Sequence, residues 1–118
     1  MNQEKIDKFF QVAIDKTKSS VLTWHRIFGS GELANFDSRF LAIMDLQRSF
    51  VSRYGNGRIL LLVNKHTDDI TCFLSPSMDL SYQRLGEDNE PQLLRLYNVV
   101  YAQFPSAESF IDSFISDP

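Results

Sequence analysis

The first apolar pattern along the chain is helical. Between residues 3 and 17, apolar side chains recur at intervals of three and four positions. These side chains are Ile6, Phe9, Phe10, Ala13 and Ile14. The spacing places them on one face of a helix, while Lys5 and Lys8 lie off that face. We therefore expect an amphipathic helix over residues 3–17, which ends at the Ser19-Ser20 pair.

Alternating and continuous apolar runs follow, and they indicate strands. The run 21–28 alternates, which turns Trp24 toward the first helix. Residues 58–64 form the clearest strand, because the middle of this segment is apolar at every position, as in a strand buried on both faces of a sheet. Alternation over 70–75 predicts another strand, and a short edge strand is expected over 80–85.

The segment between the first two of these strands allows two structures. Its Gly-Ser-Gly sequence marks residues 29–35 as a loop. Over residues 37–54, a helix with Asp37 as its N-cap and a glycine at its end competes with a strand over 45–54. The Gly-Asn-Gly turn at 55–57 is strong hairpin chemistry, and it favours the strand.

Two amphipathic helices end the chain. Pro91 starts the first helix and Pro105 ends it, whereas Ser106 caps the second helix and Glu108 lies in its first turn. Their apolar stripes are Leu93, Leu96, Tyr97, Val100, Tyr101 and Phe104 in the first helix, and Ala107, Phe110, Ile111, Phe114 and Ile115 in the second. Both stripes are typical of helices that cover a sheet.

Together these elements predict an α+β fold in one domain over residues 1–118. It contains an N-terminal helix, an antiparallel meander of four to five strands, and two C-terminal helices packed on the sheet. The composition agrees, because 43% hydrophobic and 23% charged residues exclude a disordered or fibrous chain.

The sequence also indicates the cellular compartment in which the protein is expected. The longest apolar run, residues 59–63, is far shorter than the roughly 20 residues of a membrane span, and the N-terminal MNQEKIDK lacks the apolar region of a signal peptide. A single Cys72 and two histidines are too few for an intramolecular disulfide or a structural zinc site. We therefore expect a cytoplasmic protein with no membrane contact and no metal or other cofactor.

Charge is distributed unevenly along the chain. The net charge is −3, yet residues 87–118 alone contribute −5, because six carboxylates accompany only Arg95. Residues 1–54 contribute +2. An acidic C-terminal third repels phosphates and favours a basic partner, so nucleic-acid binding is not expected.

Few groups in the sequence suit catalysis. The groups that titrate near neutral pH are His25, His66 and Cys72, and the predicted strands place them on different faces or ends of the sheet. Cys72 lies within an expected interior strand, and His66 in the turn Lys-His-Thr-Asp-Asp. We assign no catalytic, cofactor-binding or metal-binding residue, and we expect that the protein is not an enzyme.

Cations and aromatic side chains are the better candidates for a ligand or partner surface. Arg53 and Arg58 flank the expected hairpin turn, where two guanidinium groups suit a phosphate or carboxylate. The candidate residues are His25, Arg48, Arg53, Tyr54, Arg58 and Tyr82. The chain has 1 Trp, 4 Tyr and 10 Phe, which exceeds what a small core requires and indicates a protein interface.

Three segments resemble short α+β proteins of unassigned activity from bacteria and phages. They are KTKSSVLTWHRI, NGRILLLVN and LLRLYNVVYAQFPSAESFIDSFISD. The resemblance brings no site residue with it. It implies a mobile-element context, in which small acidic proteins serve as inhibitors, immunity proteins and counter-defence factors.

Two functions are consistent with these observations. The leading hypothesis is a non-enzymatic, acidic interaction protein, such as an inhibitor, an immunity-like protein or an accessory subunit, that binds a protein partner or a second copy of itself. The alternative is a protein that binds or sequesters a small anionic ligand such as a nucleotide, with arginines holding the ligand between protomers.

Overall fold

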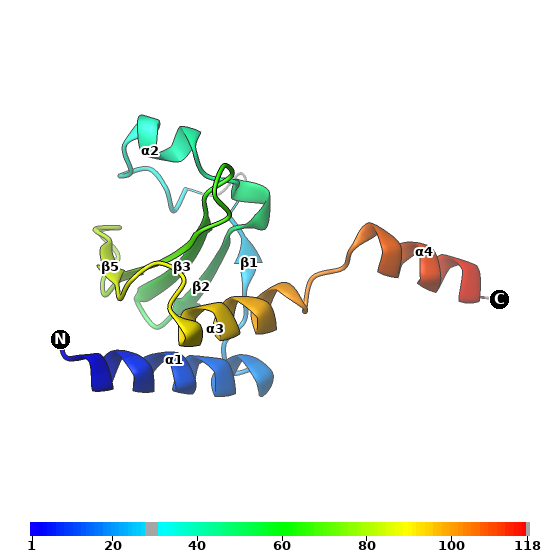
Figure 1. Ribbon diagram of the computed structural model, residues 1–118, viewed down its shortest axis with the longest axis horizontal. Helices are drawn as coiled ribbons and strands as arrows, with labels where there is room; N and C mark the ends of the chain where they lie inside the picture. Colours follow the sequence, from blue (N-terminus) through cyan, green and yellow to red (C-terminus); the bar gives the residue numbers. More distant parts are fainter. Residues whose placement is uncertain (28–30, 118) are drawn as a thin grey trace.

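A computed structural model describes residues 1–27 and 31–117. Its body is a five-stranded antiparallel sheet with two helices against one face (Figure 1). The strands are β1 (His25–Arg26), β2 (Phe50–Tyr54), β3 (Gly57–Val63), β4 (Ile70–Ser75) and β5 (Gln83–Leu85). The helices are α1 (Gln3–Lys18), α2 (Ser38–Ala42), the 3-10 helix η1 (Leu46–Arg48), α3 (Pro91–Tyr101) and α4 (Ala107–Ser116). The predicted α+β class, the meander and the two C-terminal helices are confirmed.

The β2–β3 hairpin fixes the register of the sheet. Tyr54 pairs with Gly57, and Arg53 pairs with Arg58. Gly55 adopts a φ of +59°, a left-handed conformation that glycine takes without strain. Side chains alternate along a strand, so the two arginines share one face of the sheet while Tyr54 lies on the other.

Helices α1 and α3 cover the first face of the sheet. They run parallel, because Gln3 Nε2 lies 3.4 Å from Glu90 Oε2 at one end, and Gln103 Nε2 donates to the Thr17 carbonyl at 3.2 Å at the other. Fully buried side chains fill the space beneath them. These include Phe10, Phe50, Leu61, Cys72, Leu93, Leu96 and Val100.

A second, smaller core covers the opposite face. It is closed by residues 31–48, which include α2 and η1. Its members are Ile27, Leu33, Met44, Val51, Leu60 and Leu62, surrounded by Phe36, Phe40, Phe73 and Tyr82. The Phe36 ring stacks on Phe40 at 5.6 Å and on Tyr82 at 5.1 Å. Much of the aromatic content therefore packs inside two cores, and β3 between them is buried on both faces as expected.

The first strand is shorter than the sequence predicts. Only His25–Arg26 pairs with β2, rather than the run 21–28. The amides of Val21 and Leu22 both donate to the Lys16 carbonyl, which holds this segment against the end of α1 and out of the sheet. Phe28, and the first two residues of the predicted loop 29–35, lie outside the described residues.

Both expectations for residues 37–54 are partly correct. Asp37 caps a helix, since its side chain accepts from the Arg39 amide, but that helix ends at Ala42. The predicted strand exists, although it begins at Phe50 rather than at residue 45. Pairing with the sheet ends the helix, because the Asp45 amide donates to the Val63 carbonyl at 2.7 Å.

The last helix corrects one prediction. Ser106 caps α4 as expected, but every residue from Pro105 to Asp117 is exposed, and α4 extends away from the body instead of packing on the sheet (Figure 1). The sheet face is already covered by α1 and α3, and Phe104 lies against Phe50 with 4.5 Å between ring centroids. The two helices therefore occupy the face of the sheet on which α4 was expected to pack.

Trp24 joins α1 to the sheet, as the alternation predicts. It is 6% exposed, and its Nε1 donates to Thr17 Oγ1 at 3.0 Å. We expect Trp24→Ala to lower the free energy of unfolding by about 3–5 kcal/mol, because it removes a large core side chain and a buried hydrogen bond. Urea denaturation followed by far-ultraviolet circular dichroism measures the change.

The neighbouring Val21→Ala is the matched control. Val21 is 59% exposed. Its truncation is expected to change the free energy of unfolding by no more than about 0.5 kcal/mol. Equal urea midpoints for Trp24→Ala and Val21→Ala would contradict the assigned role of the indole.

Candidate functional site

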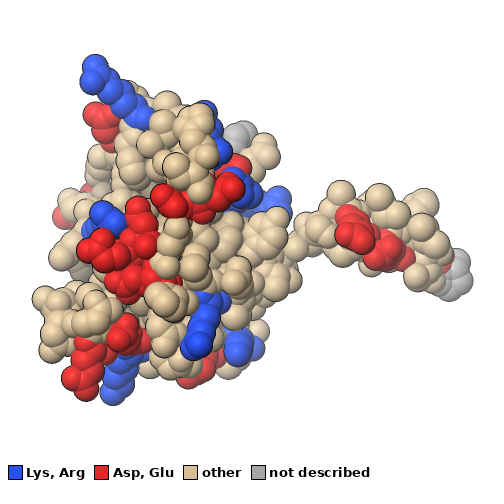
Figure 2. All heavy atoms as spheres, viewed as in Figure 1, with Lys and Arg blue, Asp and Glu red and all other residues tan. Residues whose placement is uncertain are grey.

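Helix α4 presents an apolar face to solvent. Phe110, Ile111, Phe114 and Ile115 are each between 53% and 74% exposed, and they lie on one side of the helix at positions i, i+1, i+4 and i+5. The polar positions carry Glu108 and Asp112, and no Lys or Arg follows Arg95. Figure 2 accordingly shows only acidic and uncharged side chains over α4. A contiguous exposed apolar surface of this kind is the candidate interaction surface of the protein.

The linker before α4 is held at both ends. On the body side, the Phe104 ring packs on Phe50 and lies 5.4 Å from the Arg26 guanidinium. On the helix side, Ser106 and Ser109 form a reciprocal capping box, in which each side chain accepts from the other residue's amide. Only two residues, Pro105 and Ser106, separate the anchored ring from α4. These contacts define where α4 leaves the body.

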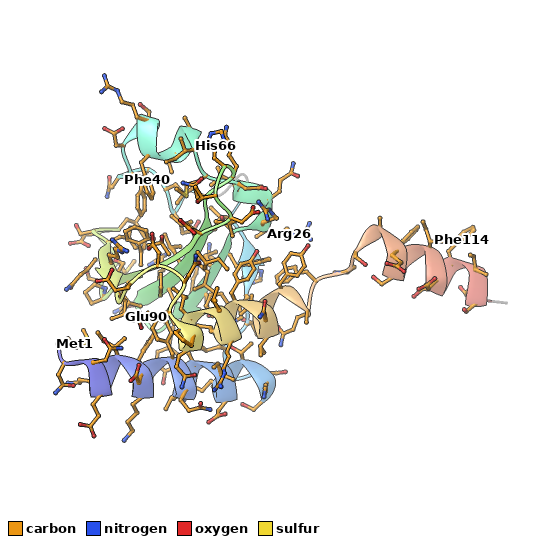
Figure 3. The ribbon with its side chains drawn as sticks, in the orientation of Figure 1. Met1, Arg26, Phe40, His66, Glu90 and Phe114 are labelled. Carbon is orange, nitrogen blue, oxygen red and sulfur yellow. The ribbon has the colours of Figure 1, made fainter. Side chains whose placement is uncertain are left out.

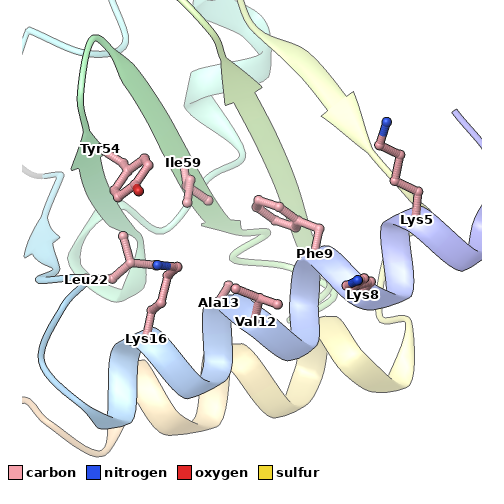
Figure 4. Close-up of a pocket in the computed structure, with 9 residues that line it drawn as sticks. All are labelled: Lys5, Lys8, Phe9, Val12, Ala13, Lys16, Leu22, Tyr54 and Ile59. Atoms are coloured by element: carbon pink, nitrogen blue, oxygen red, sulfur yellow. The ribbon is translucent and has the colours of Figure 1, made fainter.

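A groove runs along α1 on the side facing the β2–β3 hairpin (Figure 4). Its volume is about 370 Å³. The apolar lining consists of Phe9, Val12, Ala13, Leu22, Tyr54 and Ile59. Three lysines, Lys5, Lys8 and Lys16, border it, and the Lys16 ammonium lies 5.6 Å from the centre of the Tyr54 ring. The groove therefore combines an apolar floor with a cationic rim.

The sequence analysis identified Tyr54 but missed the three lysines. They recur with Val12 at intervals of three and four residues, so one edge of the amphipathic helix carries all of them. This periodicity is readable in the sequence. This edge of α1 faces a groove, rather than open solvent, because the β2–β3 hairpin lies opposite it. The sequence pattern does not predict that the hairpin lies there.

Three other candidates converge on Glu32, a carboxylate that is only 5% exposed. Arg53 Nη2 contacts Glu32 Oε1, and Arg58 Nε lies 4.0 Å from the same oxygen. Burial raises the pKa of Tyr82, and the nearby Arg58 opposes this shift. Within the described part of the chain, Arg58 Nε and the Tyr82 hydroxyl are buried without a hydrogen-bond partner.

Glu32, Arg53 and Arg58 line a pocket of about 330 Å³ together with Gly31 and Leu80, whereas Tyr82 lines a different pocket. Two guanidinium groups beside one carboxylate leave a net positive charge, which is the arrangement that binds a phosphate or carboxylate. Arg53 and Arg58 meet here because they pair across the hairpin. The sequence analysis predicted that pair, whereas Glu32 was not among its candidates, since loop residues carry no periodic signal.

Arg48 has a structural role in the observed fold. Its Nε contacts Asp45 Oδ2 and its Nη2 contacts Asp68 Oδ1, each at 2.7 Å, which ties η1 to the β3–β4 turn. Burial raises the pKa of Tyr97 to about 12, so this phenol stays protonated and donates to the Arg48 carbonyl at 2.7 Å. The remaining candidate, His25, is exposed on the edge strand β1.

The groups considered for catalysis lie apart. His25 is on β1, His66 is exposed in the β3–β4 turn, and Cys72 is buried in β4. Burial raises the pKa of the Cys72 thiol far above its usual value, which keeps the sulfur protonated and poorly nucleophilic. Among residues 1–27 and 31–117, no three His, Cys, Asp or Glu side chains gather as a metal site.

Comparison with known proteins adds no assignment. No family model matches the chain, and no curated protein and no solved structure is detectably similar to it. The resemblance to short bacterial and phage proteins therefore stays a prediction. None of the helices described here has the length and apolar character needed to cross a bilayer.

The Asp45–Arg48 pair predicts a change of stability with pH. The Arg48 guanidinium holds the pKa of Asp45 below its usual value. The pair therefore stabilises the fold fully above the unfolded pKa of about 3.9, and this contribution is lost as the pH falls through the folded pKa. We expect Asp45→Asn to cost about 0.5–1 kcal/mol at pH 7, because the pair is partly exposed, and to cost less at pH 3.

Urea midpoints at the two pH values measure this difference. Asp112→Asn, on the exposed helix α4, is the control and should leave both midpoints unchanged. The pair does not contribute as described if Asp45→Asn loses the same stability at pH 3 as at pH 7.

Proposed function

We propose that this protein is a non-enzymatic interaction protein that binds a protein partner through the apolar face of α4. The exposure of Phe110, Ile111, Phe114 and Ile115 on a well-capped helix carries the proposal. Leaving such a face in water costs free energy that a partner recovers by covering it. The inhibitor, immunity-like and accessory-subunit roles expected from the sequence all use a surface of this kind.

The arrangement of α4 indicates the mode of binding. Apolar anchors at Phe110, Phe114 and their neighbours match the pattern with which an amphipathic helix enters an apolar groove. The flanking Glu108 and Asp112 favour a partner whose groove has a basic rim. The partner is therefore expected to combine aliphatic or aromatic lining with lysine or arginine at its edge.

The positions of the two histidines and the cysteine support a role without catalysis. General acid–base or nucleophilic chemistry needs two groups within hydrogen-bond reach of one another. His25 and His66 lie on different elements, and the Cys72 thiol is buried in the core between the sheet and the helices. None of these three residues contributes to the α4 face.

Site-specific photo-crosslinking in the cells that produce the protein tests the proposal. A photoreactive phenylalanine analogue replaces Phe114 in one variant and Ser116, on the polar side of α4, in a control variant. We expect the variant modified at position 114 to yield a discrete protein adduct, because that side chain lies within the contact. The control should yield little of it.

The adduct is identified by mass spectrometry and then challenged with Ile111→Asp. A charge on the apolar face should abolish a true contact. Equal adduct yields at positions 114 and 116, or an adduct that survives Ile111→Asp, would contradict the proposal that α4 binds through its apolar face.

A second candidate function rests on the Glu32 cluster. Arg53 and Arg58 line the same pocket, and Arg58 Nε makes no hydrogen bond there, which supports binding of a small anion such as a nucleotide phosphate. We expect inorganic phosphate or a nucleoside monophosphate to raise the melting temperature of the protein, because a ligand that binds only the folded state stabilises it. Arg58→Gln should abolish this rise.

The matched control is Arg39→Gln, on the exposed surface of α2, which should keep the rise. Differential scanning calorimetry over a phosphate series at constant ionic strength measures both variants. A melting temperature that responds equally in Arg58→Gln and in the unmodified protein would remove the anion site from consideration.

A further inference from the structure

We propose that the partner of α4 is a second copy of the same chain. In this arrangement α4 of each copy lies in the lysine-bordered groove along α1 of the other copy, so that two identical contacts form a reciprocal dimer. The inference rests on the proposed function, because it names the partner for the same apolar face. Five arguments support it.

The apolar surfaces match in kind. The α4 face offers two phenylalanines and two isoleucines. The groove is lined by aliphatic and aromatic side chains, of which Val12 is 39% and Tyr54 is 59% exposed. Contact between the two surfaces would therefore remove the apolar side chains of both from water. One chain thus carries both halves of a helix-in-groove contact.

The charges are complementary. Lys5, Lys8 and Lys16 border the groove, and no acidic side chain lines it. The α4 segment carries Glu108, Asp112 and Asp117, with no basic side chain. Complementary rims of this kind steer association and fix the register of the docked helix. A groove with an acidic rim would repel the same helix.

The lengths also agree. Helix α4 has 10 residues, which corresponds to about 15 Å at the rise of an α-helix. The 12 residues of α1 from Lys5 to Lys16 cover about 18 Å at the same rise. The docked helix would therefore extend along most of the border of lysines.

The linker directs α4 away from its own groove. Phe104 is anchored between Phe50 and Arg26, and Pro105 and the Ser106 cap leave only two residues before the helix begins. In Figure 3, Phe114 accordingly lies far from the body that carries Met1 and Glu90. The longest dimension of the molecule, 52 Å against 32 and 28 Å, reflects this extension. An extended arm with a fixed base is suited to a neighbouring molecule.

Reciprocal exchange also produces enough contact area. A fully buried phenylalanine contributes about 150–250 Å², and Phe110 and Phe114 are 66% and 74% exposed, so the four phenylalanines of two α4 helices contribute about 420–700 Å². Stable protein interfaces bury about 1,200–2,000 Å² in total. The isoleucines and the groove residues supply the remainder.

The first experiment measures mass in solution. Size-exclusion chromatography with multi-angle light scattering is expected to give twice the 13.6 kDa of one chain at micromolar concentration. Phe114→Asp is expected to weaken the dimer by about 30-fold or more, as loss of a central anchor does. Circular dichroism checks that the variant retains its helical content.

The decisive experiment exchanges the charges. A groove variant carries Lys5→Glu with Lys8→Glu, and an arm variant carries Glu108→Lys with Asp112→Lys. Each variant alone places like charges together in both contacts, so each is expected to dimerise about tenfold more weakly or worse. Mixed together, the two variants restore opposite charges in both contacts, and we expect a heterodimer as tight as the original dimer. Lys18→Glu with Lys65→Glu, which lie outside the groove, is the control with an equal charge change.

Each other outcome overturns the inference in a recognisable way. A monomer at 100 μM whose α4 amides exchange rapidly with deuterium shows that no second copy covers the helix. A monomer with protected α4 amides shows that α4 folds onto its own chain. A dimer that is insensitive to the charge exchange shows that α4 docks elsewhere. A crosslink from position 114 to a different protein rejects the second copy, while the proposed function stands.

Discussion

Burial of β3 on both of its faces is the constraint on which the rest of the structure depends. Leu60, Leu61 and Leu62 are fully buried, and neighbouring strands pair along both edges of β3. Each fully buried leucine contributes about 1.5–3 kcal/mol, so a covering layer is required on each side. Helices α1 and α3 form one layer, and residues 31–48 form the other. Every other element is positioned by these two layers.

The same constraint explains why α4 stays outside. Two helices already occupy one face of the sheet, and the second face is closed by α2, η1 and the rings of Phe36 and Phe40. With α1 and α3 already packed on the first face, α4 is the amphipathic helix that extends away from the sheet. A partner that covered the apolar stripe of α4 would remove its apolar side chains from water, and the proposed binding function rests on that gain in free energy.

The surroundings of each arginine also depend on where it lies relative to these two layers. Arg48 lies where η1 meets the β3–β4 turn and is engaged by two carboxylates, so it supports the fold. Arg53 and Arg58 lie at the open end of the second layer, where Glu32 partly balances their charge. Arg48 contacts two carboxylates, whereas Arg53 and Arg58 share one, and the proposal of an anion site rests on this difference.

Local patterns in the sequence determined the elements. The helical stripe of α1, the continuous apolar run of β3, the glycine turn after Tyr54 and the cap at Ser106 each act over a few neighbouring residues. The burial of Cys72 and the contact of Trp24 with α1 followed from the same patterns. Periodicity reports which side chains avoid water, and it does so without reference to distant residues.

Tertiary structure alone decided which of these elements pack on the sheet and which remain exposed. The apolar stripe from Phe110 to Ile115 has the same spacing in the sequence whether it covers a sheet or remains exposed. That spacing does not depend on what lies opposite the helix. The end of α2 at Ala42 was set by pairing between Asp45 and Val63, and the groove beside Lys8 was set by the hairpin across from it. These outcomes depend on contacts between residues far apart in the chain, and a local pattern carries no information about them.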